Sequence, residues 1–229
     1  MDRARRLLAA LALGVGLGQA SCAGVPLPLT AEGELARGIA LHDAGDHRGA
    51  VEHLRRALER DPRLGDAYLY LARSQLALGD WRAALGTFQD ALARLPAERR
   101  SAMIASAVEA FIAFALGLVL ADRLEEATAV LAETARLVPD SAPAREALAA
   151  SLLAYGRDLL SDRRWSDAIT QFRRALELAP GEIAAYVELA RALLSSGELA
   201  RALEALRDAL RLAPEHPEAN DLLGRLLRV

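Results

Sequence analysis

Lysine is missing from this chain, cysteine occurs once, and aromatic residues make up only 4% of it. Because Cys22 has no second cysteine to pair with, an intramolecular disulfide is excluded. All 28 basic residues are arginines, and 31 acidic residues outnumber them, which gives a formal net charge of −3. A chain without excess positive charge lacks the electrostatic attraction that drives nucleic-acid binding. We therefore expect no nucleic-acid partner.

The short motifs of common catalytic and metal sites are also missing. The sequence contains no H-E-x-x-H, G-x-S-x-G or C-x-x-C pattern and no Walker loop. His42, His47 and His53 have a spacing that a metal site on helices could use, but surface histidines are the commoner outcome. We expect a protein that is not an enzyme, with no catalytic residue, no cofactor and no metal site.

Alanine and leucine are what the chain has in abundance. Apolar residues make up 53% of the sequence, which is ample for a core. Alanine and leucine are strong helix formers, and few segments alternate between apolar and polar residues as strands do. The composition predicts an all-α protein.

A pattern of alanine, a large apolar residue four positions later and a proline twelve positions after the alanine occurs five times. Pro62 and Pro96 are 34 positions apart, as are Pro180 and Pro214. This period, with its A-x₃-F…P signature, resembles the tetratricopeptide repeat (TPR) family. The resemblance implies a right-handed α-solenoid of about five helix–turn–helix units with a C-terminal capping helix. The five sets are Ala50–Leu54–Pro62, Ala84–Phe88–Pro96, Ala127–Leu131–Pro139, Ala168–Phe172–Pro180 and Ala202–Leu206–Pro214.

The repeats suggest domain boundaries, with two irregular units in the middle. Pro96 and Pro139 are 43 positions apart, and Pro139 and Pro180 are 41 apart, so we expect residues 99–107 and 142–148 to lengthen the first helices of repeats three and four. We divide the chain into a signal peptide (1–21), a tether (22–30) and a TPR solenoid (31–229). The repeats are expected at about 31–64, 65–98, 99–141, 142–182 and 183–216, followed by a cap at 217–229.

The stretch from Met103 to Leu120 is unusually apolar, with Glu109 as its only charge. Its uncharged part, from Ala110 to Ala121, is shorter than the run of about 18 residues that a membrane span needs, so we expect no span here. Two interpretations stay open: a long core helix buried by both neighbours, or an apolar patch left exposed for a partner or a second copy of the chain.

The N-terminus is typical of a bacterial secretory signal. Arginines precede an apolar run from Leu7 to Leu17, and small residues follow around Cys22. The segment from Gln19 to Cys22 resembles the lipobox of bacterial lipoproteins, with Gln19 where leucine is usual. The resemblance implies lipidation at Cys22 and a place on the periplasmic face of the outer membrane. The alternative is cleavage after Ala20 or Ala23, which would release a soluble periplasmic protein.

The TPR resemblance further implies which residues line a binding groove built from first helices. An arginine stands on this wall in three of the four internal repeats, flanked by aliphatic residues, which suits a peptide with apolar anchors and carboxylates. The alternative is that these arginines are solvated or paired with acids such as Asp66 and Asp158. The predicted wall consists of Leu69, Arg73, Leu76, Ile112, Leu116, Val119, Leu153, Arg157, Leu160, Val187, Arg191 and Leu194.

We therefore predict an exported, lipid-anchored TPR scaffold that binds protein segments in its groove and organises the assembly of envelope proteins. It would contact other proteins, such as assembly or secretion components, and the membrane through the lipid on Cys22. Three alternatives stay open: a soluble periplasmic adaptor, a non-catalytic subunit of an envelope enzyme complex, and a scaffold that self-associates through residues 103–120.

Overall fold

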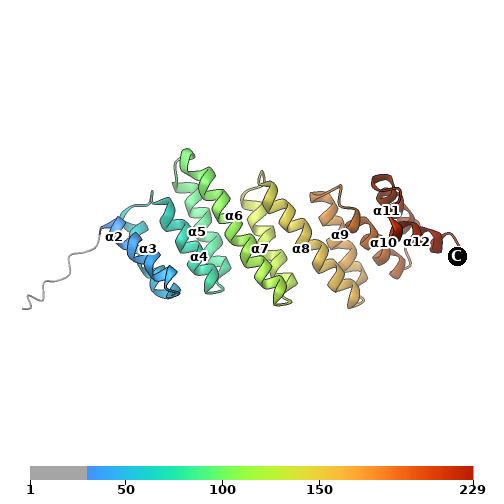
Figure 1. The fold of residues 1–229 in the computed structure, drawn as a ribbon, viewed down its shortest axis with the longest axis horizontal. Helices are drawn as coiled ribbons and strands as arrows, with labels where there is room; N and C mark the ends of the chain where they lie inside the picture. The colour runs from blue at the N-terminus through green and yellow to red at the C-terminus, as the bar shows by residue number, and fades with distance from the viewer. Residues whose placement is uncertain (1–29, 229) are drawn as a thin grey trace, which may run out of the picture. The chain divides into compact units, whose positions relative to one another are not determined.

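The computed structural model describes residues 30–228. The predicted signal peptide, Cys22 and the tether up to residue 29 lie outside the described residues. Within residues 30–228 the chain forms eleven α-helices and no strand, which confirms the predicted all-α solenoid fold (Figure 1). The helices are α2 (Ala31–Asp43), α3 (His47–Arg60), α4 (Gly65–Ala77), α5 (Trp81–Arg94), α6 (Ala97–Leu120), α7 (Leu124–Leu137), α8 (Ala142–Ser161), α9 (Trp165–Leu178), α10 (Ile183–Ser195), α11 (Leu199–Leu212) and α12 (Pro217–Leu226).

The helices form consecutive antiparallel pairs, and a proline follows the second helix of each pair. Proline inside a helix would remove a hydrogen bond and clash with the preceding turn. It therefore marks where each second helix must stop. In all five pairs the proline lies two residues after the last helical residue: α3, α5, α7, α9 and α11 are followed by Pro62, Pro96, Pro139, Pro180 and Pro214.

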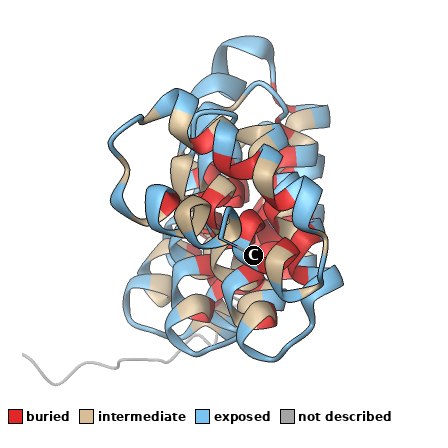
Figure 2. Cartoon of the chain, turned by 90° about the vertical axis from the view of Figure 1, so that its right-hand side faces the viewer, coloured by how far each residue is buried: buried red, intermediate tan, exposed pale blue. Residues whose placement is uncertain are grey.

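Small residues allow the two helices of each pair to approach closely. The alanines of the repeated pattern are completely buried, and the large residue four positions on lies on the same face of the helix. Figure 2 shows the buried residues, in red, on the inward sides of the helices. On the first helices, Gly38 lies against Leu54, and Gly156 lies against Phe172. A larger side chain at either glycine would not fit without movement of its neighbour.

Turns between the helices of a pair need a residue with positive φ. Gly45, Gly79 and Gly197 supply it in the first, second and fifth pairs, with φ between 80° and 83°. The third and fourth pairs have Asp122 (φ 60°) and Arg163 (φ 61°) at this place. A side chain in this region costs free energy that glycine avoids.

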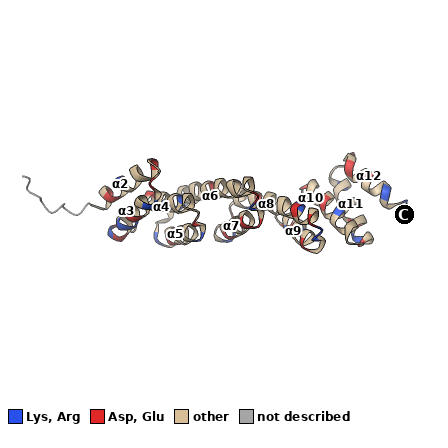
Figure 3. Ribbon diagram, turned by 90° about the horizontal axis from the view of Figure 1, so that it is seen from below, with Lys and Arg blue, Asp and Glu red and all other residues tan. Residues whose placement is uncertain are grey.

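The first helices of the third and fourth pairs are longer than the others, as expected. Helix α6 has 24 residues and α8 has 20, whereas α2, α4 and α10 have 13 each. Figure 3 shows α4, α6 and α8 along one side of the stack and α5, α7 and α9 along the other, with α6 tan over most of its length. The lengthened helices thus add area to the side formed by first helices.

By length and composition, α6 could cross a membrane, although the short uncharged run had led us to expect no such segment. In the structure it is the first helix of the third pair and contacts α4 and α7, with 33% of its most apolar window buried. Met103, Phe111 and Leu118 face the core, whereas Leu116 and Leu120 are 58% and 89% exposed. Helix α6 is therefore a core helix with one open apolar face.

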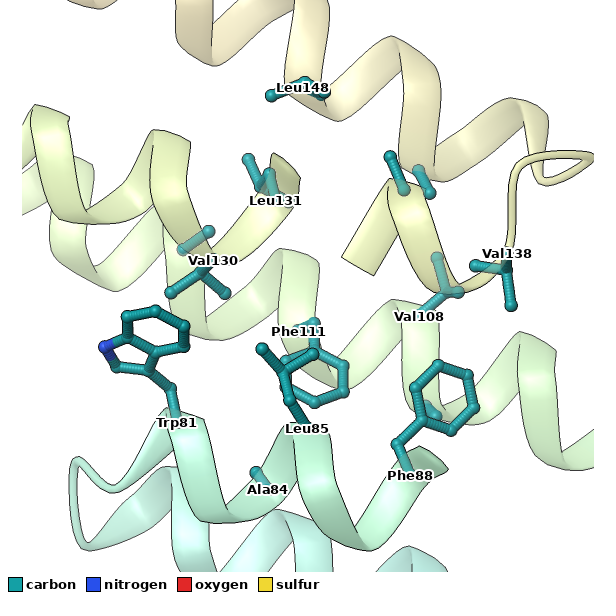
Figure 4. Packing of buried hydrophobic residues seen from close by; sticks show 14 of the residues in the cluster. Trp81, Ala84, Leu85, Phe88, Val108, Phe111, Val130, Leu131, Val138 and Leu148 are labelled. Atoms are coloured by element: carbon teal, nitrogen blue, oxygen red, sulfur yellow. The ribbon is translucent and has the colours of Figure 1, made fainter. Parts of the chain in front are cut away.

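The largest hydrophobic cluster lies in the middle of the stack. Phe88 on α5 and Phe111 on α6 are completely buried, and their ring centroids are 5.9 Å apart. Val130 and Leu131 of α7 and Leu148 of α8 extend the same cluster (Figure 4). Burial of each such side chain stabilises the fold by about 1.5–3 kcal/mol. This cluster holds α6 in place and fixes the orientation of its open face.

Candidate binding surface

Two hollows lie end to end between α4 and α6 on the side formed by first helices. The first, which we call the Leu69 hollow, has a volume of about 460 Å³. The second, the Arg73 hollow, is one helical turn further along both helices and also measures about 460 Å³. The Leu69 hollow is lined by Leu35, Leu64, Gly65, Asp66, Leu69, Glu98, Arg99, Ala102, Met103 and Ser106, and the Arg73 hollow by His42, Arg73, Leu76, Ala77, Glu109, Ala110, Ala113 and Phe114.

A third hollow, of about 580 Å³, lies on the other side of α6, where the connection to α8 begins. Its lining is mostly aliphatic and includes residues from the lengthened N-terminal parts of both α6 and α8. Helix α6 thus borders all three hollows, and Glu109 borders two of them. The lining residues are Leu92, Arg100, Ser101, Ile104, Ala105, Val108, Glu109, Leu137, Val138, Pro139, Asp140, Ser141 and Pro143.

Two residues of the predicted wall are mostly buried and belong to the hydrophobic clusters between helices. Val187 is 2% exposed, whereas Leu76 is 5% exposed and still lines the Arg73 hollow. Of the other ten, Leu116, Arg157 and Arg191 are exposed, and the remainder are partly buried: Leu69, Arg73, Ile112, Val119, Leu153, Leu160 and Leu194.

Arg157 and Arg191 are already paired with acids. Arg157 Nε donates to Glu188 Oε1 at 2.8 Å, and the other oxygen of Glu188 lies 3.6 Å from Arg191 Nη1. Arg191 also contacts Glu218 at the start of the cap helix. These four residues form a charge ladder across α8, α10 and α12. The acids are thus Glu188 and Glu218 rather than Asp66 and Asp158, and an incoming carboxylate would have to displace them.

Arg73 differs from the other two wall arginines, because it forms no ion pair within residues 30–228. Its guanidinium carbon lies 5.8 Å from the centre of the Tyr70 ring, a cation–π contact. Glu109 and His42 border the same hollow. Arg73 is the one wall arginine whose charge is open to a ligand from solvent.

His42 joins α2 to α4 beside Arg73. Its Nδ1 is 2.9 Å from Ser74 Oγ, and its ring lies edge-on to Tyr70 with centroids 5.4 Å apart. Burial lowers the pKa of His42 below its ordinary value of 6.5, and nearby His47, whose ring centroid is 5.1 Å away, lowers it further. His42 is therefore neutral near pH 7.

His53 is held elsewhere in the first pair. Its Nδ1 lies 2.6 Å from Glu34 Oε2, and Arg60 lies 3.2 Å from the other oxygen of this buried carboxylate. The hydrogen bond to His53 is the main cause that lowers the pKa of Glu34. No group of three or more His, Cys, Asp or Glu side chains in the described part of the chain is arranged to hold a metal ion.

His42 and Glu188 are neighbours of the predicted wall that were not expected from the sequence. For Glu188 a signal existed, because it stands one helical turn before Arg191 and therefore on the same face of its helix. For His42 no signal existed, since its contact with Ser74 depends on how far the first pair is offset along the second. On second helices, Arg55, Arg56, Arg173 and Arg174 are all exposed.

The chain is similar to several solved structures, and the first of those below supports the all-α fold. A TPR repeats protein from Bacteroides fragilis has a TM-score of 0.63 with 13% sequence identity, over 88% of this chain and 99% of that chain. A TPR protein from Thermus thermophilus is 26% identical over 87% of this chain and 100% of that chain, with a TM-score of 0.33. The APC/C hetero-tetramer Cut9-Hcn1 gives 19% identity and a TM-score of 0.40 over 88% of this chain, which spans only 43% of that chain.

No curated protein sequence gives a significant match. The sequence model described as a tetratricopeptide repeat matches residues 41–107 and 159–226. Members of this family are generally non-catalytic scaffolds for proteins or peptides. The two matched stretches cover more than half of the chain. The chain belongs to the tetratricopeptide repeat family.

Proposed function

We propose that this TPR protein is an exported, lipid-anchored scaffold that binds protein segments on the face formed by α4 and α6 and so organises envelope proteins. The observation that carries the proposal is the pair of hollows between α4 and α6, with the unpaired Arg73 in one of them. A hollow with an apolar lining and a few polar groups is the usual form of a binding site.

The open face of α6 indicates what kind of segment would fit. Leu116 is 58% exposed, and Ala113 and Gly117 beside it are small enough to allow close approach. An amphipathic helix or an extended segment could place aliphatic side chains along this ridge. A carboxylate on the same segment would find Arg73, since guanidinium groups bind carboxylates with two parallel hydrogen bonds.

A capture experiment tests the binding proposal. Envelopes would be cross-linked with the wild type, with Arg73→Glu and with Leu116→Asp, and the captured proteins would be identified by mass spectrometry. Matched controls are Arg174→Glu and Leu212→Asp, which change an exposed arginine and an exposed leucine on second helices. Partners lost with the first two variants and kept with the controls support the proposal. Equal capture by all five proteins contradicts it.

The proposal of export and lipidation is supported by the sequence of residues 1–22 alone. Mass spectrometry of the mature protein would detect the lipid at Cys22, and Cys22→Ser is expected to move the protein from the membrane to the soluble fraction. A mature protein without lipid that starts near residue 21 or 24 would instead indicate the soluble periplasmic adaptor.

Self-association through α6 is a second candidate, favoured by the exposure of Leu116 and Leu120. Sedimentation velocity would distinguish the two. A dimer that Leu116→Asp converts to a monomer supports self-association, whereas a monomeric wild type excludes it.

A further inference from the structure

The proton on the His42 ring can be assigned from its neighbours. Ser74 Oγ donates its only proton to the Tyr70 carbonyl oxygen at 2.8 Å. It must therefore accept a hydrogen bond from His42, whose Nδ1 is 2.9 Å away. Neutral His42 thus carries its proton on Nδ1, and Nε2 is the basic nitrogen. No hydrogen bond to Nε2 is formed by any residue between 30 and 228, so this nitrogen can take up a second proton.

The groups around His42 decide when that protonation occurs. His47 from α3 and Arg73 from α4 oppose a positive charge on the ring, and Asp43 on α2 itself favours it. From α4, Tyr70 presents its ring and Ser74 its hydroxyl, and from α6 Glu109 borders the same hollow. In the unliganded protein partial burial of the ring favours the neutral imidazole, and His47 and Arg73 add to this effect.

We propose that the Arg73 hollow binds an aspartate or glutamate side chain of the captured segment, and that His42 takes up a proton when this carboxylate binds. The carboxylate would lie between Arg73 and Nε2 of His42, and an adjacent apolar side chain would contact Ala110, Ala113 and Phe114 on α6. Segment binding then becomes tighter as the pH falls from neutral to mildly acidic. This inference rests on the proposed function and adds the chemistry of one recognition pocket.

Charge complementarity is what selects this occupant. The hollow is lined by Arg73, which forms no ion pair within residues 30–228, and by His42, against one carboxylate, Glu109. A bound carboxylate favours the charged form of the imidazole, so its binding raises the affinity of His42 for a proton. By linkage, a proton on His42 raises the affinity for the carboxylate by the same factor. Glu109 competes for the same cations, and its removal should strengthen binding.

Two synthetic peptides serve as probes: acetyl-Leu-Glu-Leu-amide and the matched acetyl-Leu-Gln-Leu-amide. Their affinities for the protein would be measured by NMR titration at about pH 7.5 and about pH 5.5, a range over which glutamate stays ionised and histidine titrates. The Glu peptide is expected to bind about tenfold more tightly at the lower pH, which corresponds to a rise of about one unit in the pKa of His42 on binding. The Gln peptide should bind weakly at both pH values.

Variants assign the effect to individual groups. His42→Gln should abolish the pH dependence, Arg73→Gln should weaken binding at both pH values, and Glu109→Gln should strengthen it. His216→Asn is the control, because His216 caps α12 and asparagine can replace it there. It should leave the pH dependence unchanged. Circular dichroism at both pH values would show that each variant is folded.

The outcomes separate this inference from the proposed function. Equal affinity of the Glu peptide at both pH values overturns the role of His42, and equal binding of the two peptides overturns the carboxylate pocket. Absence of binding by either peptide also overturns it. In each case the proposed function is decided independently by the capture experiment with Leu116→Asp, since Leu116 lies outside the Arg73 hollow.

Discussion

Gly156 on α8 lies so close to Phe172 on α9 that a Cβ added to the glycine would be 2.5 Å from Cε1 of the ring. Phe172 is completely buried and occupies the middle of its helix pair, so the ring has no free space to move into. The glycine is therefore required by the packing of this pair and not by any turn of the backbone.

We expect Gly156→Ala to destabilise the protein by about 1–3 kcal/mol, the usual cost of overpacking a close contact. The matched control is Gly86→Ala on α5, where no atom lies within 4 Å of the added Cβ. There alanine should stabilise the helix by about 0.5–1 kcal/mol. Urea unfolding of both variants checks the prediction, and equal effects would contradict the close contact.

The charge ladder predicts a measurable coupling between α8 and α10. Glu188 is 12% exposed, so its interaction with Arg157 is less screened than that of a surface pair. A double-mutant cycle of Arg157→Ala and Glu188→Gln should give a coupling free energy of about 0.5–1.5 kcal/mol. The exposed pair Arg211 and Asp208, on one helix, should give less. A coupling near zero for both pairs would refute the ladder as a stabilising link.

The unliganded protein should lose stability in mild acid because of His42. Its pKa in the folded state is lowered by burial below the ordinary 6.5, so the folded protein binds fewer protons than the unfolded chain. The stability contributed by this difference is present above pH 6.5 and is lost as the pH falls towards the lowered pKa. Melting temperatures between about pH 7.5 and about pH 5 should fall less for His42→Gln than for the wild type. Parallel curves would contradict this.

The backbone conformation of Arg163 indicates that a substitution there can stabilise the protein. Its φ of 61° places a long side chain in the left-handed region, where Gly45, Gly79 and Gly197 serve in other pairs. Arg163→Gly should raise the free energy of unfolding by about 0.5–1 kcal/mol. Gly197→Ala, the reverse change at the matching place, should lower it by a similar amount. Thermal melts of the two variants test whether Arg163→Gly raises the stability and Gly197→Ala lowers it.

The periodic features were predictable because they depend on contacts within one repeat. Ala168, Phe172 and Pro180 mark a buried site, the side chain that fills it and the end of the helix, all from spacing along one helix. Contacts between repeats were harder to predict from the sequence, because they depend on the offset of one helix pair against the next. Val187, expected on the wall, is therefore found in the core, and the partner of Arg157 was not identified.

The open face of α6 could be foreseen only as one of two alternatives. Sequence shows that Leu116 and Leu120 are apolar, but not whether a neighbouring helix covers them. The structure answers this, because Leu116 and Leu120 are 58% and 89% exposed at the C-terminal end of α6, away from the N-terminal residues that lengthen it.

The three hydrophobic clusters differ in size, and this affects the order in which parts of the molecule unfold. In a stack where each pair touches mainly its neighbours, local opening starts where the fewest apolar contacts are lost. The small cluster of the first pair should open before the large one around Phe111. His42 is on that first pair, and Arg73 is on its neighbour. A ligand bound to both residues would link the first helix pair to the second. Its binding should therefore slow amide exchange throughout α2 and α3, well beyond the residues that it contacts.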